Sequence, residues 1–265
     1  RRRPCSTLRR LRRGPFSDVA QIEPRAGDAS FRIVRHASLT STMDEAAALV
    51  RSGDPGGVWV VADAQTGGRG RHGRQWVSEP GNLYATLLLV DPCRIERAPQ
   101  LGFVAGLALH DALSALTTLA DRIRLKWPND ALIGDAKLAG ILLEGFSRAA
   151  VSAARSHAVA IGIGVNLRHH PDDLPYEATD LRSQRWEIAP LDLLAALSTA
   201  MRAPEMYEAS GVARKAATLA TSSSCPIRPS GVISCQIASA FSPPIRFMPS
   251  VPAMGPGTML FALIP

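Results

Sequence analysis

Residues 68–76 read GRGRHGRQW, with three glycines and three arginines ahead of a tryptophan. Glycine allows a ligand to approach the backbone closely, and arginine presents a planar cation suited to carboxylates and phosphates. Apolar runs at 58–62 (VWVVA) and 83–90 (LYATLLLV) flank this stretch. The pattern predicts two antiparallel neighbouring strands joined by an anion-binding loop. A solvated basic hairpin and an RNA-binding patch are the alternatives.

The chain as a whole is long and apolar enough for one large domain, or for a main domain with a small appendage. It has 265 residues, of which 46% are hydrophobic, and a net charge of +7. Much of the positive charge is local, because arginine stands at positions 1, 2, 3, 9, 10, 12 and 13. We therefore expect residues 1–29 to form a disordered basic tail rather than a basic face of the folded body.

Cysteine usage and hydropathy restrict the class of protein further. Cys5, Cys93, Cys225 and Cys235 show no CxxC spacing, which argues against a zinc knuckle and a dense disulfide framework. A reducing, cytoplasmic compartment fits best. No run approaches the roughly 20 apolar residues of a membrane span, so no membrane association is expected.

Hydrophobic periodicity predicts alternating strands and helices up to about residue 208. Ser41 and Thr42 precede two acids and are expected to cap a helix that stops before Gly53. A two-residue turn, Gly134-Asp135, should join two strands. The expected strands are 31–34, 58–62, 83–90, 123–126, 131–133, 137–144 and 158–166, and the other expected helices are 98–119 and 191–206.

Two short segments carry particular structural information. Pro128 cannot continue a central strand, so the strand 123–126 should end there and leave Asn129 and Asp130 at a strand edge or turn. Gly162 and Gly164 alternate within an otherwise apolar strand. This spacing indicates that another part of the molecule approaches that strand closely.

Four segments could meet at one site: 41–42, the basic loop, 127–130 and 137–140. Together they offer hydroxyls, cations for phosphates, a lysine for a carbonyl or phosphoryl oxygen, and a carboxylate for magnesium. The sequence contains no GxxxxGK[ST] loop, so the arginine loop would have to hold any nucleotide. Chemistry at such a site would depend on charge stabilisation of a phosphoryl or acyl-phosphate centre.

The chain resembles the biotin–protein ligases over about residues 31–200. The resemblance is carried by GRGRHGRQW at 68–76, KWPND at 126–130, KLAGI at 137–141 and GIGVN at 162–166, in this order. It implies an α/β (α+β) fold of the class II synthetase-like, biotin–lipoate ligase type, with a mixed, largely antiparallel sheet flanked by helices. The catalytic domain is expected at 30–208.

The resemblance also implies a two-step, ATP-dependent ligase reaction. Biotin and ATP with Mg2+ give biotinoyl-AMP and pyrophosphate. A lysine on the biotin carboxyl carrier protein of acetyl-CoA carboxylase, or of a related carboxylase, then takes the biotinoyl group. Lipoate ligase or octanoyltransferase activity on the same fold, and a non-catalytic biotin- or nucleic-acid-binding protein, are the alternatives.

Matching the motifs position by position assigns roles to individual residues. Lys137, Arg69 and Asp130 are the implied catalytic residues, and Asp130 is also a candidate for Mg2+. Trp76 and Trp127 are candidates for packing. The implied biotin contacts are Ser41, Thr42, Gln65, Arg69, Gly70, Arg71 and Lys137, and the implied nucleotide contacts are Arg71, Arg74, Asn129 and Asn166.

Three features depart from the family pattern. Met43 follows Ser-Thr where the family usually has Asn, which puts one polar contact near biotin in doubt. No helix-turn-helix pattern precedes residue 31, so we expect the monofunctional type, without a DNA-binding domain and without DNA as a partner. Residues 209–265 lose their acidic residues and periodicity, and form an atypical segment in place of the usual SH3-like domain. A change of reading frame near Met201 or divergence would explain that segment.

Overall fold

The computed structural model describes residues 31–148, 156–201 and 258–259. The predicted basic tail (1–29) lies outside the described residues. So does the predicted atypical C-terminal segment, apart from residues 258–259, as does the last part of the helix expected at 191–206. Within the described ranges, every helix is too short or too polar to cross a membrane.

One mixed sheet organises the described residues, in the order β1-β2-β3-β7-β6-β5-β4, with β8 paired to β6. The first two strands are parallel and the other pairs are antiparallel, which confirms the expected mixed, largely antiparallel sheet. The strands are β1 (Arg32–His36), β2 (Val58–Ala62), β3 (Leu83–Val90), β4 (Ile123–Lys126), β5 (Asp130–Ile133), β6 (Ala136–Arg148), β7 (Ser156–Val165) and β8 (Thr258–Met259).

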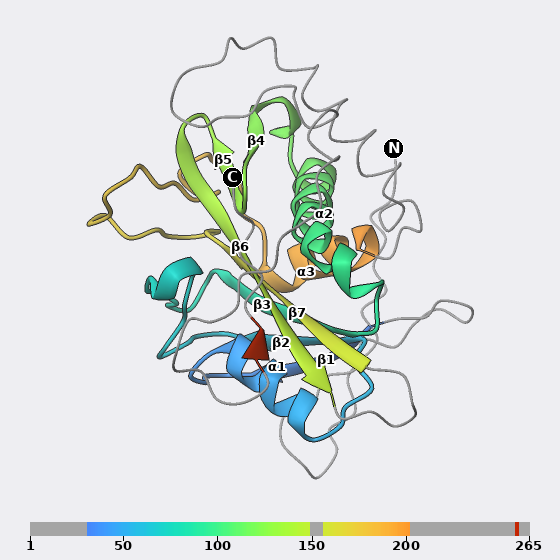
Figure 1. Cartoon of the computed structure of the whole chain (residues 1–265). Helices are drawn as coiled ribbons and strands as arrows, with labels where there is room; N and C mark the ends of the chain where they lie inside the picture. Colours follow the sequence, from blue (N-terminus) through green and yellow to red (C-terminus); the bar gives the residue numbers. More distant parts are fainter. Residues whose placement is uncertain (1–30, 149–155, 202–257, 260–265) are drawn as a thin grey trace, which may run out of the picture.

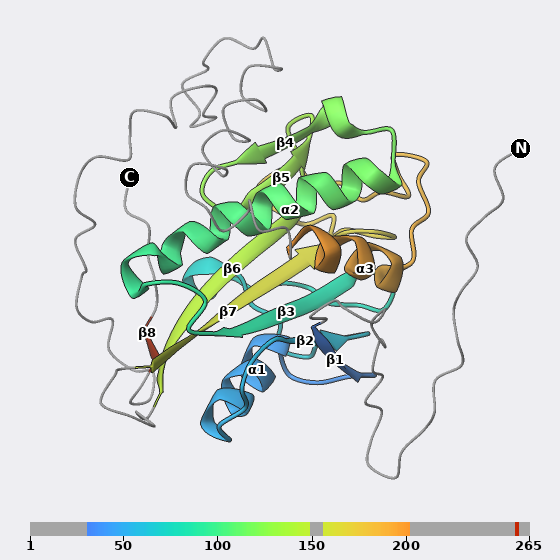
Figure 2. The same cartoon turned by 90° about the vertical axis from the view of Figure 1, so that its right-hand side faces the viewer.

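Helices cover both faces of this sheet, as Figures 1 and 2 show. Helix α1 (Thr42–Arg51) lies on one face and joins the parallel strands β1 and β2, as a parallel crossover requires. Helices α2 (Leu101–Leu116) and α3 (Pro190–Ala200) pack against each other on the other face. Short 3₁₀ turns occur at η1 (Arg71–Gly73), η2 (Ile95–Gln100) and η3 (Ala120–Arg122).

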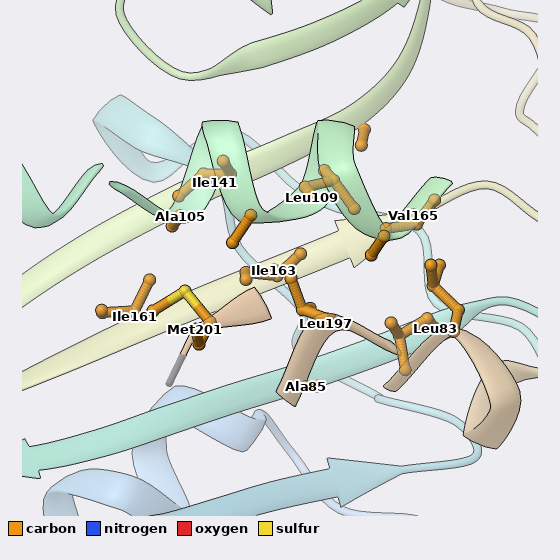
Figure 3. Packing of buried hydrophobic residues seen from close by; sticks show 14 of the residues in the cluster. Leu83, Ala85, Ala105, Leu109, Ile141, Ile161, Ile163, Val165, Leu197 and Met201 are labelled. Atoms are coloured by element: carbon orange, nitrogen blue, oxygen red, sulfur yellow. The ribbon is translucent and has the colours of Figure 1, made fainter. Parts of the chain in front are cut away.

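The main hydrophobic core lies between the sheet and the α2–α3 layer. Odd-numbered residues of β7, among them Ile161 and Ile163, point toward Leu109 of α2 and Leu197 of α3 (Figure 3). Even-numbered residues such as Ala160 face the smaller cluster around α1. Strand periodicity therefore places Gly162 and Gly164 on the α1 face, where the candidate site is found.

The sequence-based element predictions agree closely with the structure, with shifts at several ends. The predicted long helix was expected from residue 98, but residues 95–100 form the 3₁₀ turn η2, which contains Pro99. Strand β6 extends to Arg148, beyond the predicted end at 144, because it pairs with β7 along its whole far half. The predicted turn Gly134-Asp135 joins β5 and β6, and Gly134 has φ +64°.

Candidate functional site

A cavity of about 300 Å³ lies on the α1 face of the sheet. Its floor is formed where β6 and β7 pair, at Gly140 opposite Gly164 and at Leu142 opposite Gly162. An added Cβ at Gly164 would lie 2.7 Å from the Trp76 ring, and one at Gly140 would lie 3.1 Å from it. Trp76 therefore lies directly on two paired glycines, which confirms the close approach predicted for the glycine-bearing strand.

The start of α1 forms one wall of the cavity. Ser41 caps the helix and accepts a hydrogen bond from the Met43 amide at 3.3 Å. The Thr42 amide donates to Gln65 Oε1 at 2.8 Å, and the Thr42 hydroxyl accepts from Thr86 at 2.8 Å. Because Ser41 and Thr42 are almost fully buried, this wall presents fixed polar groups to any bound molecule.

The basic loop forms the opposite wall and folds back on itself like a hairpin. The Trp76 amide donates to the Gly68 carbonyl at 2.9 Å, and the Gly70 amide donates to the Arg74 carbonyl at 2.7 Å. Gly73, with φ +70°, follows a left-handed His72 at the tip. The glycines thus permit the tight reversal that brings the arginines to the cavity.

Arg69 is held by protein carboxylates rather than left free in the cavity. Its Nη1 donates to Asp44 at 2.6 Å, and its Nε and Nη2 donate to Glu144 at 3.3 Å each. Burial alone would lower the pKa of Arg69, but the two carboxylates outweigh it and hold that pKa above its usual value. The role of Arg69 as a direct biotin contact remains a prediction.

Arg71 and Arg74 are the loop cations left to face a ligand. Arg71 donates one long hydrogen bond, 3.4 Å, to the side-chain oxygen of Asn129, and both arginines line the cavity. Among the described residues, neither has a carboxylate within ion-pair distance. They are therefore available for carboxylate or phosphate oxygens.

Lys137 lies at the third wall, on β6. Its Nζ is 2.7 Å from Asp130 Oδ1, and it lies 5.5 Å from the centre of the Trp76 ring and 5.4 Å from that of Tyr176. Such aromatic contacts fix the position of an ammonium group. Asp130 begins β5 and Asn129 precedes it, as expected from the end of the strand at Pro128.

The cavity brings together all the sequence-predicted site residues except one. The predicted site residues that line it are Ser41, Thr42, Gln65, Arg69, Gly70, Arg71, Arg74, Asn129, Asp130 and Lys137, and Trp76 also lines it. Asn166 does not line it: its side chain is buried and donates to the Thr179 carbonyl at 3.1 Å. This amide joins the end of β7 to the chain near Thr179, and the role of Asn166 beside a nucleotide remains a prediction.

The sequence reasoning missed several residues that line the cavity or hold a residue that does. Glu144 follows the KLAGI motif by three positions on the same strand, and its buried carboxylate pairs with Arg69. Tyr84 and Tyr176 line the cavity, and Trp76, a candidate for packing, lines it as well. A buried charge in a central strand was the one signal in the sequence that could have indicated Glu144.

Met43, where the resemblance leads us to expect asparagine, contacts both the cavity and a hydrophobic cluster. It lines the cavity, and it also belongs to the buried cluster that contains Ala46 and Val50. Its sulfur lies 3.0 Å from the position of a Cβ at Gly162. The predicted loss of one polar contact thus coincides with a thioether packed against the cavity floor.

The chain is similar to several known proteins. Residues 36–166 match the Biotin/lipoate A/B protein ligase family. A biotin--[acetyl-CoA-carboxylase] ligase of Paracoccus denitrificans is 47% identical over 133 residues, which are 50% of this chain and 54% of the relative. The bifunctional ligase/repressor BirA of Bacillus subtilis is 38% identical over 150 residues, 56% of this chain and 44% of BirA. The chain thus spans about half the length of these curated relatives.

Solved structures show the same fold. A biotin protein ligase from Aquifex aeolicus in complex with biotin and ATP is 30% identical, with a TM-score of 0.52, covering 64% of this chain and 68% of that one. The Leishmania major biotin protein ligase in complex with biotinyl-5-AMP is 28% identical, with a TM-score of 0.54, covering 66% and 74%.

Proposed function

This chain belongs to the Biotin/lipoate A/B protein ligase family, and from that premise we propose that it is a biotin–[acetyl-CoA-carboxylase] ligase. The observation that carries the proposal is the single cavity that joins polar groups at the start of α1, two loop arginines and Lys137. A ligase that activates a carboxylic acid with ATP needs these three kinds of group within reach of one another.

The proposed first step joins biotin to AMP. The biotin carboxylate attacks the α-phosphorus of ATP, a mixed anhydride forms, and pyrophosphate leaves with the bonding electrons. Two anionic groups must approach each other, so Arg71, Arg74 and Lys137 supply the compensating positive charge. Ser41, Thr42 and Gln65 would bind the polar ring system at the buried end of the cavity.

Magnesium is the proposed cofactor, and the residues present fit it. Mg2+ is usually bound by one or two carboxylates together with substrate phosphates and waters. Asp130 supplies one carboxylate in the cavity, and among the described residues no group of three or more metal-binding side chains forms a protein-only site. When bound, Mg2+ would neutralise phosphate charge, with Asp130 holding it beside Asn129.

The proposed second step transfers the biotinoyl group to a lysine of a biotin carboxyl carrier protein. The lysine amine attacks the anhydride carbonyl, an amide bond forms, and AMP leaves. Lys137 and Arg71 stabilise the charge on the departing phosphate, and Asp130, which lines the cavity, accepts the proton from the amine. The loop excludes water from the anhydride until the acceptor arrives.

Two further expectations belong to this proposal. Residues 30–208 form the catalytic domain, which includes all the residues that line the cavity. The protein works in the cytoplasm, where biotin carboxyl carrier proteins are its partners and where the scattered cysteines stay reduced. We expect neither DNA nor a membrane among its partners.

A lipoate ligase is the second candidate, because the matching family includes lipoate as well as biotin ligases and because Met43 places a thioether in the cavity. The test is transfer to a purified biotin carboxyl carrier domain with MgATP and either acid, followed by intact mass. Biotin attachment to one lysine supports the proposal. Attachment of lipoate but not of biotin would replace it with the second candidate.

A further inference from the structure

We propose that Asp44 and Glu144 are positioning residues that hold the basic loop closed over the cavity through Arg69. The inference deepens the proposed function, on which it rests for the nature of the ligand. It assigns Arg69 to the protein's own framework and leaves Arg71 and Arg74 to the ligand.

The first support is the pairing of every nitrogen of the Arg69 guanidinium with a protein carboxylate. Its three nitrogen atoms each donate to a protein carboxylate, one to Asp44 and two to Glu144. The side chain of Arg69 is 23% exposed. Three of its five N–H groups are engaged in this way, so Arg69 is largely committed to the protein's own carboxylates.

The second support is the burial of Glu144. Its side chain is 4% exposed, on the cavity face of β6, and Arg69 is its one ion-pair partner among the described residues. An unpaired carboxylate in such a place is strongly unfavourable, so Glu144 favours the loop arrangement that delivers Arg69 to it. The ion pair between Glu144 of β6 and Arg69 thereby attaches the start of the loop to the sheet.

The third support is the position of Asp44. It lies in the first turn of α1, next to the residues that form the opposite cavity wall, and its Oδ1 is 2.6 Å from Arg69. Arg69 thus connects the α1 wall, the loop wall and the β6 floor. A ligand that contacts both walls would be released more slowly while these ion pairs last.

The experiment compares Glu144→Gln and Asp44→Asn with the matched control Asp63→Asn. Asp63 forms a two-oxygen ion pair with Arg35 away from the cavity, at 2.8 to 3.0 Å. Trypsin cleavage after Arg71 and Arg74, followed by mass spectrometry of the released peptides, reports loop opening without any ligand. Biotin dissociation from the full-length protein is measured in parallel by stopped flow.

Glu144→Gln should raise the rates of loop cleavage and biotin dissociation about tenfold. Asp44→Asn should raise both about twofold, because Asp44 is half exposed. Both variants should raise the KM for biotin more than they lower kcat, and Asp63→Asn should match the wild type. Unchanged cleavage in both loop variants would overturn the inference, as would an equal change in Asp63→Asn.

Two controls separate this inference from the proposed function. If Glu144→Gln does not fold, Asp44→Asn, altered at an exposed position, still decides the question. If the wild type binds no biotin, the proposed function fails, whereas the cleavage rates still test the role of Asp44 and Glu144.

Discussion

Lys137 is positioned by one ion pair and two aromatic rings, and each contact lies within the cavity. Lys137→Met should therefore remove positive charge from the reacting phosphate while keeping most of the packing. We expect biotinoyl-AMP formation to fall by at least about 100-fold, with little change in Tm. Arg124→Met is the control, because it breaks an exposed pair with Asp135 in the turn between β5 and β6. Equal activity in the two variants would refute the assigned role.

The substitution Gly164→Ala tests the contact between the cavity floor and the basic loop. A Cβ added there would lie 2.7 Å from the Trp76 ring, so Gly164→Ala should displace that tryptophan and the end of the loop. Biotin affinity should fall about tenfold or more in isothermal titration. Gly102→Ala adds the same methyl group with nothing within 4 Å and should bind biotin normally. Normal binding by Gly164→Ala would show that Trp76 does not shape the cavity.

Several properties of individual residues could not be read from the sequence. Arg69 pairs with Glu144, which is 75 positions away along the chain, and only folding brings the two together. Asn166 is buried just after β7, and its amide donates to the Thr179 carbonyl, a contact that the sequence pattern does not indicate. Local patterns identify residues suited to chemistry, whereas long-range pairing decides which of them reach the cavity.

The three arginines of the basic loop have different roles: Arg69 binds protein carboxylates, whereas Arg71 and Arg74 face the ligand. Arg74 is exposed at the rim of the cavity and lacks a carboxylate partner among the described residues, so it is free to bind phosphate. Arg74→Ala should raise the KM for ATP about tenfold and leave biotin affinity unchanged. Arg51→Ala, at the exposed end of α1, removes the same charge elsewhere. An identical KM for ATP in both variants would remove Arg74 from the nucleotide site.

Most helices and strands were predictable because their hydrophobic periods are strong. The turn at Gly134-Asp135 and the end of β4 before Pro128 follow from local backbone chemistry, and both are confirmed. The order of the strands was not predictable from these signals. Strand β7 enters the sheet between β3 and β6, so the glycines of β6 and β7 meet under Trp76 only after long-range pairing.

The segment after β7 contributes to the pH dependence of stability. Asp180 accepts from the Ser183 amide and lies 2.6 Å from His170 Nδ1. Burial alone would raise the pKa of Asp180, but the Ser183 amide and His170 outweigh it and lower that pKa. The stabilisation is therefore complete above the unfolded value of about 4 and is lost as the pH falls through the lower folded value.

Asp180→Asn should accordingly lower Tm at pH 7 by about 2–4 °C, which corresponds to roughly 1 kcal/mol. The difference from the wild type should shrink as the pH falls from 5 to 3, measured by thermal melts in circular dichroism. Asp172→Asn, at an exposed position of the same segment, is the control. A difference in Tm that stays constant over this pH range would contradict the role given to Asp180.

The described residues form one sheet, and one cavity on it joins motifs that are far apart in the chain. The sequence was sufficient to predict the fold class and the meeting of four segments, since each motif lies at the end of a strand or helix. It did not predict that Tyr84 and Tyr176 line the cavity or that Glu144 pairs with Arg69. These residues lie between or beyond the motifs and take their places through the pairing and packing of the sheet.

Biotin-dependent exchange of pyrophosphate into ATP by the purified chain tests the proposed ligase most directly. It isolates acid activation from acceptor transfer, with lipoate and octanoate as the comparison acids. The account predicts exchange with biotin and MgATP, little with the other two acids, and at least about 100-fold less in Lys137→Met. Absence of biotin-dependent exchange from a folded protein, or exchange with lipoate alone, would contradict it.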